Sequence, residues 1–166
     1  MLTNSRRVHM LAEYALLLTV ALLLSWLESI LPLQFPVPGV KLGLSNLTVV
    51  FLLYRKPFWQ VFLFGLGKCL LSLTFTGRLS GLIFSLAGYF CAIFVMALLR
   101  NSRFFSPLGV NVAGAAFHGV GQLAAAAVLF TPEVFGFLPL MTLCSAGCGI
   151  VTWGVLRVLL LHPGLK

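Results

Sequence analysis

Long apolar runs, separated by short polar gaps, are the feature that most restricts how this chain can fold. A helix that crosses a bilayer needs about 20 mainly apolar residues. Hydrophobic residues make up 60% of the 166 residues and charged residues only 8%, whereas a soluble domain carries about 25% charged residues. The sequence therefore predicts an all-α integral membrane protein, a single domain over residues 1–166 with six transmembrane helices, at about residues 8–31, 40–54, 58–75, 79–99, 108–130 and 135–161.

Most of the basic residues lie on one side of these spans, and they predict the orientation of the chain. They are Arg6, Arg7, Arg55, Lys56, Arg100, Arg103, Arg157 and Lys166. Because segments rich in Lys and Arg stay in the cytoplasm, we expect both termini to be cytoplasmic and the loops 32–39, 76–78 and 131–135 to face outward. A net charge of +8 would suggest nucleic acid in a soluble protein. Topology explains most of that charge here, so no nucleic-acid partner is expected.

Three cations do not fit this topology. Lys41 and Arg78 lie at the predicted outer ends of their spans, and Lys68 lies in the middle of the third span. A lysine at mid-membrane costs about 2.5–3.5 kcal/mol on insertion scales, so it is expected to face a polar cavity or a partner. Of the three glutamates, Glu13 is near the inner end of its span, and Glu28 and Glu133 are near the outer surface. With no carboxylate expected at its depth, Lys68 favours an anion-binding role over an ion pair.

The fifth predicted span carries further polar residues. His118 and Gln122 are four residues apart and share a helix face, and His118 lies at the depth of Lys68. Interhelical hydrogen bonding explains Gln122 and Asn111 equally well. We predict an outward-facing site for an anionic small molecule, such as a phosphate, diphosphate or carboxylate, with these substrate-binding residues: Lys41, Asn46, Lys68, Arg78, His118 and Gln122.

The sequence lacks the motifs of common membrane-associated enzymes. It has no Asp, no nucleotide-binding G-x-x-x-x-G-K-[ST] loop and no HExxH, so neither an Asp-rich magnesium site nor ATP hydrolysis by that loop is expected. Cys144 and Cys148 share a helix face, but small buried thiols are a more common explanation than a metal site. We therefore predict a protein that is not an enzyme, with no catalytic residue, no metal and no cofactor.

A carrier of this composition needs an external energy source, since no mid-membrane carboxylate is expected for proton coupling. Ala15 and Thr19 form a small-xxx-small pair on the first span, a pattern that lets another helix approach closely. They are candidate partner-docking residues, although lipid-facing or intramolecular packing is the ordinary interpretation of such a pair.

Several stretches together resemble the Gx transporter family, many members of which are described as heptaprenyl diphosphate synthase component I. They are LLLSWLESILP, PGVKLGLSNL, FSLAGYF and VAGAAFHGVGQL. The resemblance covers nearly the whole chain and implies a location in the bacterial inner (cytoplasmic) membrane. This family is similar in fold to the S components of energy-coupling factor transporters. That similarity implies a six-helix bundle, an outer loop acting as a lid, and a coupling membrane subunit with ATPases as partner.

Three functional hypotheses follow. The first is a substrate-binding membrane subunit of an energy-coupling factor type transporter for an anionic small molecule, such as a flavin, a vitamin-like compound or an isoprenoid diphosphate. The second is a non-catalytic membrane component associated with a polyprenyl (heptaprenyl) diphosphate synthase. The third is a scaffold subunit whose polar contacts are only structural.

Overall fold

The computed structural model describes residues 4–30, 41–77 and 79–161, and these residues form helices without any strand. The predicted all-α class is therefore confirmed. The elements are α1 (Asn4–Ile30), α2 (Asn46–Leu53), α3 (Phe58–Thr76), α4 (Leu79–Arg100), α5 (Pro107–Leu129), a short 3-10 helix η1 (Pro132–Phe137), and α6 (Leu138–Leu161). The predicted lid loop 32–39 and Arg78 lie outside the described residues.

Four segments are long and apolar enough to cross a membrane: Arg7–Ile30, Leu79–Arg100, Pro107–Leu129 and Pro132–Val155. The chain is therefore a multi-pass membrane protein. The apolar part of α3, Phe58–Thr74, is shorter. The eight residues of α2 rise only about 12 Å, well short of the roughly 30 Å hydrocarbon core. Of the six predicted spans, the structure thus supports four by length and composition.

The second predicted span, residues 40–54, differs from the expectation of one continuous helix. Residues 41–45 precede α2 in non-helical conformation. Gly43 has a φ of 91°, in the left-handed region that glycine adopts without steric cost. An ideal Cβ at this position would lie 2.9 Å from His118 Cδ2. Both the backbone angle and the close approach of α5 therefore favour glycine, and the helix begins only after it.

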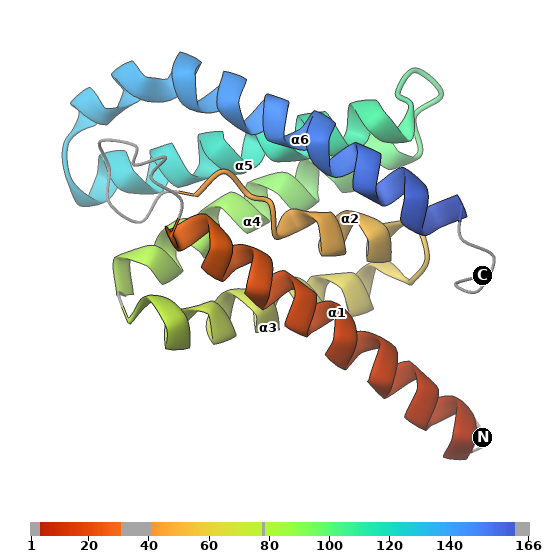
Figure 1. The fold of residues 1–166 in the computed structure, drawn as a ribbon. Helices are drawn as coiled ribbons and strands as arrows, with labels where there is room; N and C mark the ends of the chain where they lie inside the picture. Colours follow the sequence, from red (N-terminus) through yellow and green to blue (C-terminus); the bar gives the residue numbers. More distant parts are fainter. Residues whose placement is uncertain (1–3, 31–40, 78, 162–166) are drawn as a thin grey trace.

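The eight residues of α2 are all buried, and this helix lies in the middle of the bundle. It contacts α1 and α3 on one side and α4 and α6 on the other, while α5 packs mainly against α4 and α6 (Figure 1). A short helix with six apolar residues out of eight requires such surroundings, since it has no wide polar face for water. The position of α2 also fixes where the preceding residues 41–45 must lie.

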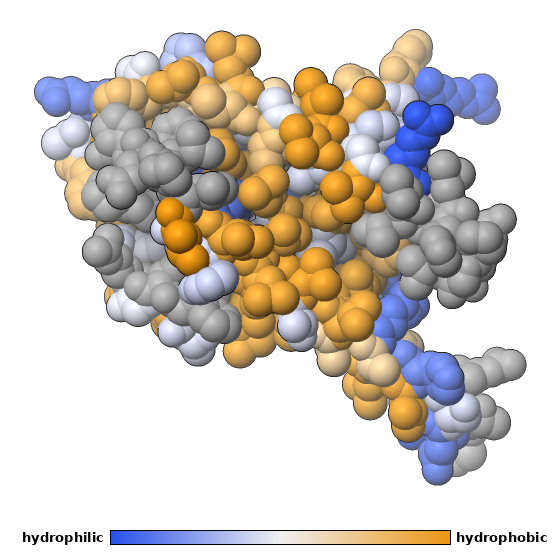
Figure 2. Space-filling view, viewed as in Figure 1, coloured by the Kyte–Doolittle hydropathy of each residue, from blue (hydrophilic) through white to orange (hydrophobic). Residues whose placement is uncertain are grey.

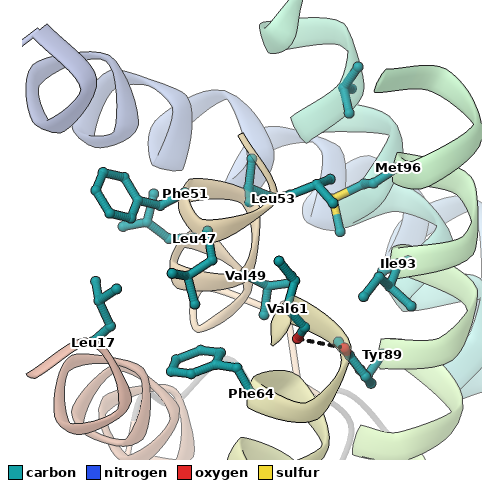
Figure 3. Close-up of a cluster of buried hydrophobic side chains, with 14 of the residues drawn as sticks. Leu17, Leu47, Val49, Phe51, Leu53, Val61, Phe64, Tyr89, Ile93 and Met96 are labelled. Atoms are coloured by element: carbon teal, nitrogen blue, oxygen red, sulfur yellow. Dashed lines mark hydrogen bonds between the residues drawn. The ribbon is translucent and has the colours of Figure 1, made fainter. Parts of the chain in front are cut away.

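The apolar side chains around α2 form the larger of two core clusters. Leu47, Val49 and Leu53 point from α2 toward residues of α1, α3 and α4 (Figure 3). Tyr89 of α4 is fully buried, and its hydroxyl donates to the carbonyl oxygens of Val61 and Phe62 of α3 at 3.2 and 3.0 Å. The hydrogen bonds satisfy the buried phenol and hold α3 against α4.

The outer surface of the bundle is largely apolar. Large hydrophobic side chains such as Leu11, Leu63 and Phe94 are more than 60% exposed, and hydrophobic residues cover the middle of the face in Figure 2. Such a surface suits lipid, because water-soluble proteins rarely expose large contiguous apolar areas. Helix α1 begins and helix α6 ends at the same end of the bundle (Figure 1). The prediction that both chain termini are cytoplasmic is not tested by this arrangement and stays a prediction.

Candidate functional site

The non-helical residues 41–45 lie inside the bundle, and side chains from other helices satisfy their backbone. The amides of Gly43 and Leu44 donate to Glu28 Oε1 of α1 at 2.6 and 2.8 Å. The amide of Lys41 donates to Gln122 Oε1 of α5 at 2.8 Å. Irregular backbone at membrane depth is stable only where protein or water supplies such partners. Glu28 and Gln122 therefore hold the unwound segment in place from opposite sides.

Lys68 of α3 is only 4% exposed and contacts the beginning of α2. Its Nζ donates to Asn46 Oδ1 at 2.9 Å and to Ser45 Oγ at 3.2 Å. In the part of the chain that the structure describes, Lys68 forms no ion pair with a carboxylate. Its amino group is held by neutral oxygens, which leaves its charge uncompensated by direct pairing.

Lys41 contributes the second cation of the site. Its Nζ donates to Ser25 Oγ of α1 at 2.7 Å. Ser25 and Glu28 lie one turn apart on α1, so one helix supplies a neutral partner for the Lys41 side chain and a carboxylate for the backbone nearby. This arrangement brings the predicted residues Lys41, Asn46 and Lys68 together around the start of α2.

His118 and Gln122 of α5 are both buried and in direct contact, with 2.7 Å between their Nε2 atoms. Gln122 Oε1 accepts from the Lys41 amide, so its Nε2 is the amide nitrogen and can only donate. His118 Nε2 is then the acceptor, and the neutral ring carries its proton on Nδ1. The predicted shared face of His118 and Gln122 is present, and it is turned toward residues 41–45.

These groups lie around a small cavity of about 10 Å³, which is room for about one water molecule. Its lining is almost entirely polar or ionisable: Ser25, Glu28, Lys41, Ser45, Lys68, Cys69, Ser72, Ser85 and His118. The lining holds two lysines and one glutamate, so it carries a surplus of positive charge when His118 is neutral.

One sequence-based expectation is wrong. The basic residues were predicted to lie together without an acid, but Glu28 lies beside them. The carboxylate lies in the cavity wall, and its Oε2 has no hydrogen-bond partner among the described atoms. The sequence contained a signal for this, because Glu28 and Lys41 were both placed near the outer ends of their spans. Ser25, one turn before Glu28, was missed because serine is common in membrane helices and carries no charge.

Two other sets of polar residues lie away from this cavity. The side-chain amide of Asn111 donates to the Gly149 carbonyl and, at 3.0 Å, to Thr152 Oγ1, so it joins α5 to α6. This supports the interhelical interpretation of Asn111. Ala15 and Thr19 are exposed on α1, and the Thr19 hydroxyl donates to the Ala15 carbonyl at 2.9 Å. The pair shares one face as predicted, and its docking role stays a prediction.

The fold and the site define a class: a multi-pass, all-α membrane protein with a buried, doubly basic polar centre around an unwound segment. Within this class, the chain belongs to the family described as heptaprenyl diphosphate synthase component I, whose family model matches residues 17–159. That range contains every residue that lines the cavity, and it confirms the family resemblance in the sequence. Comparisons with curated proteins and with solved structures found no match, so the likeness to S components stays a prediction.

Proposed function

We propose that this protein is the substrate-binding subunit of a membrane transporter for an anionic small molecule. One observation carries the proposal: Lys41 and Lys68 converge on the unwound segment before α2, with a single carboxylate, Glu28, in the cavity wall. Buried cations in a membrane bundle are costly and mark ligand or ion paths by default. Broken helices near the membrane interior are also a common way for transporters to build such sites.

The hydrogen bonds within the site suggest how an anion is held. The amino groups of Lys68 and Lys41 are donors whose present partners are neutral oxygens of Asn46, Ser45 and Ser25. An anionic oxygen accepts a stronger, charge-assisted hydrogen bond than a neutral one. An anion therefore replaces these internal partners, while the side chains of Asn46 and Gln122 orient it.

The size of the cavity requires a conformational step. A cavity of about 10 Å³ does not admit a phosphate group, so the unwound segment 41–45 must move away from α1 or α5 when the ligand enters. The outer lid that the family resemblance implies, residues 32–39, lies outside the described residues and stays a prediction.

The proposed substrate is anionic and, in some cases, amphipathic: a flavin, a vitamin-like compound or an isoprenoid diphosphate. The chain is proposed to act in the bacterial cytoplasmic membrane without catalysis, and energy would come from a coupling membrane subunit with ATPases that docks at Ala15 and Thr19. This assignment corresponds to an energy-coupling factor type S component.

The test is mass spectrometry of small anions that co-purify with the protein in mild detergent, followed by equilibrium binding of the anion found. Lys68→Ala is expected to abolish binding, whereas Arg103→Gln, which removes an exposed cation outside the cavity, is expected to have no effect. Circular dichroism and gel filtration of both variants establish that they are folded. Equal affinity in Lys68→Ala and the unaltered protein would rule out the assignment.

The family description supports a second candidate, a non-catalytic membrane component associated with a polyprenyl diphosphate synthase. In that function the polar centre would accept the diphosphate end of a lipid product, or would only hold the helices together. Co-purification with a soluble, Asp-rich synthase, without uptake of any solute by proteoliposomes, is the result that favours this candidate over the transporter.

A further inference from the structure

A second polar cavity lies at the other end of α2, far larger than the first. It has a volume of about 560 Å³ and is lined by residues of the α2–α3 turn and of the last turn of α4: Leu53, Tyr54, Arg55, Lys56, Pro57, Phe58, Ala97, Arg100 and Asn101. It lies at the end of the bundle where α1 begins and α6 ends (Figure 1). By the distribution of basic residues, this is the predicted cytoplasmic end.

The cavity has more cations than anions. Lys56 forms an ion pair with Glu13 at 2.6 Å, and Arg55 lies 4.0 Å from the same carboxylate. The Arg55 guanidinium also lies 4.8 Å from the centroid of the Phe51 ring, a contact that orients it. Arg100 forms no ion pair with any carboxylate in the described part of the chain. Glu13 thus pairs closely with Lys56 and only loosely with Arg55, so Arg100 and the loosely paired Arg55 are the cations of this cavity best placed to bind an anion.

The surroundings of the cavity suit the headgroup end of a lipid. Leu53, Phe58 and Ala97 add apolar walls beside the cations. Phe58 is 41% exposed and the adjacent Trp59 is 70% exposed, and tryptophan is enriched at membrane–water interfaces. A ligand with a phosphate in the cavity and acyl chains along the exposed apolar surface matches both the cations and the apolar walls. A free phosphate would use only the cationic part.

We propose that this cavity binds the phosphate of an anionic phospholipid, with Arg55 and Arg100 as its ligands. Arginine forms paired, charge-assisted hydrogen bonds with phosphate oxygens, and basic pockets between membrane helices on the cytoplasmic side bind anionic headgroups. The site lies outside the Lys41–Lys68 cavity and does not depend on the transport proposal. Its occupant ties the α2–α3 turn to the end of α4, and α2 is the helix whose first turn forms the other site.

Native mass spectrometry of the purified full chain, with dioleoylphosphatidylglycerol or dioleoylphosphatidylcholine added in detergent, tests this proposal. The unaltered protein is expected to retain phosphatidylglycerol and to lose phosphatidylcholine. The double variant Arg55→Gln/Arg100→Gln is expected to bind phosphatidylglycerol about thirtyfold more weakly, the product of the usual contributions of two basic residues near the surface. Arg103→Gln, a neighbouring exposed arginine that does not line the cavity, is the matched control and is expected to bind normally.

Three outcomes overturn the proposal: equal retention of both lipids, equal binding by the double variant and Arg103→Gln, or displacement of phosphatidylglycerol by millimolar inorganic phosphate, which indicates a site for free phosphate. If the double variant fails to fold, Arg100→Gln alone decides, because Arg100 forms no ion pair among the residues that the structure describes. It is expected to bind phosphatidylglycerol about fivefold more weakly, and unchanged binding contradicts the proposal.

Discussion

The backbone amide of Lys41 and the side chain of Gln122, 81 positions apart in the sequence, are joined by a hydrogen bond of 2.8 Å. Through the other end of its amide, Gln122 contacts His118. One buried side chain therefore connects the unwound segment before α2 to the polar face of α5. The stability of the candidate site depends on such cross-helix contacts, and several substitutions test them directly.

Gln122→Leu removes both contacts while nearly keeping the side-chain volume. The Lys41 amide and the His118 ring nitrogen then lose their partner inside the bundle. We expect a loss of about 1–3 kcal/mol in the free energy of unfolding, the usual cost of a buried polar group left unsatisfied. Unfolding of the purified protein in detergent measures it. Gln60→Leu is the control: it removes an exposed hydrogen bond from the Tyr14 hydroxyl, 2.7 Å long, and is expected to cost less than Gln122→Leu. An equal loss in both variants contradicts the structural role of Gln122.

Glu28 accepts two backbone hydrogen bonds. Two substitutions at this position separate the effect of its charge from the effect of its acceptor oxygen. Glu28→Ala leaves the amides of Gly43 and Leu44 without their acceptor, and we expect it to destabilise the fold by about 2–5 kcal/mol. Glu28→Gln keeps an oxygen at the same place and is expected to restore more than half of that loss. Equal destabilisation by the two variants would show that the charge of Glu28, and not its acceptor oxygen, stabilises the segment.

Gly43→Ala tests the unwound conformation itself. Its φ of 91° is strained for alanine, and the added Cβ would lie 2.9 Å from His118 Cδ2 and 3.1 Å from Asn46 Nδ2. We expect a loss of stability of about 1–3 kcal/mol. The matched control is Gly67→Ala in α3, where the added Cβ meets open space, and there a gain of about 0.5–1 kcal/mol is expected from helix propensity. A neutral effect at Gly43 contradicts the observed backbone.

Ala15→Leu/Thr19→Leu tests the proposed docking face of α1. Both residues are exposed, so we expect thermal stability to change little, within about 0.5 kcal/mol. Bulky side chains prevent close approach of a second helix, so co-purification with a coupling membrane subunit is expected to fall at least tenfold (about 1.4 kcal/mol). Val20→Leu, also exposed on α1, is the control. Undiminished co-purification of the double variant would move the docking face elsewhere.

The multi-pass membrane class and the grouping of several polar residues could be predicted from the sequence, because charged and amide side chains stand out within apolar runs. Lys68, His118 and Gln122 are polar residues inside apolar runs, and all three lie at or beside the cavity. Hydropathy, however, predicts only how deep a residue lies along its span. The sequence did not give the rotation of each helix, so the separation of Asn111 from His118 and the approach of Glu28 to residues 43 and 44 were not predictable.

The interrupted second span was missed for a different reason. Residues 40–54 are apolar enough to suggest one helix, and hydropathy does not register a backbone angle. Gly43, Ser45 and Asn46 are compatible with a helix interior as well as with a helix start. Among the described residues, contacts from Glu28, Gln122 and Lys68 stabilise the unwound conformation.

The most direct test of the central claim is binding of the co-purified anion to Lys68→Ala. The unaltered protein is isolated in mild detergent, its small anionic ligand is identified by mass spectrometry, and the affinity of that ligand is measured for both proteins and for Arg103→Gln. The account predicts that a folded Lys68→Ala protein loses at least a hundredfold in affinity, about 2.7 kcal/mol, while Arg103→Gln binds normally. An affinity of folded Lys68→Ala equal to that of the unaltered protein would contradict it.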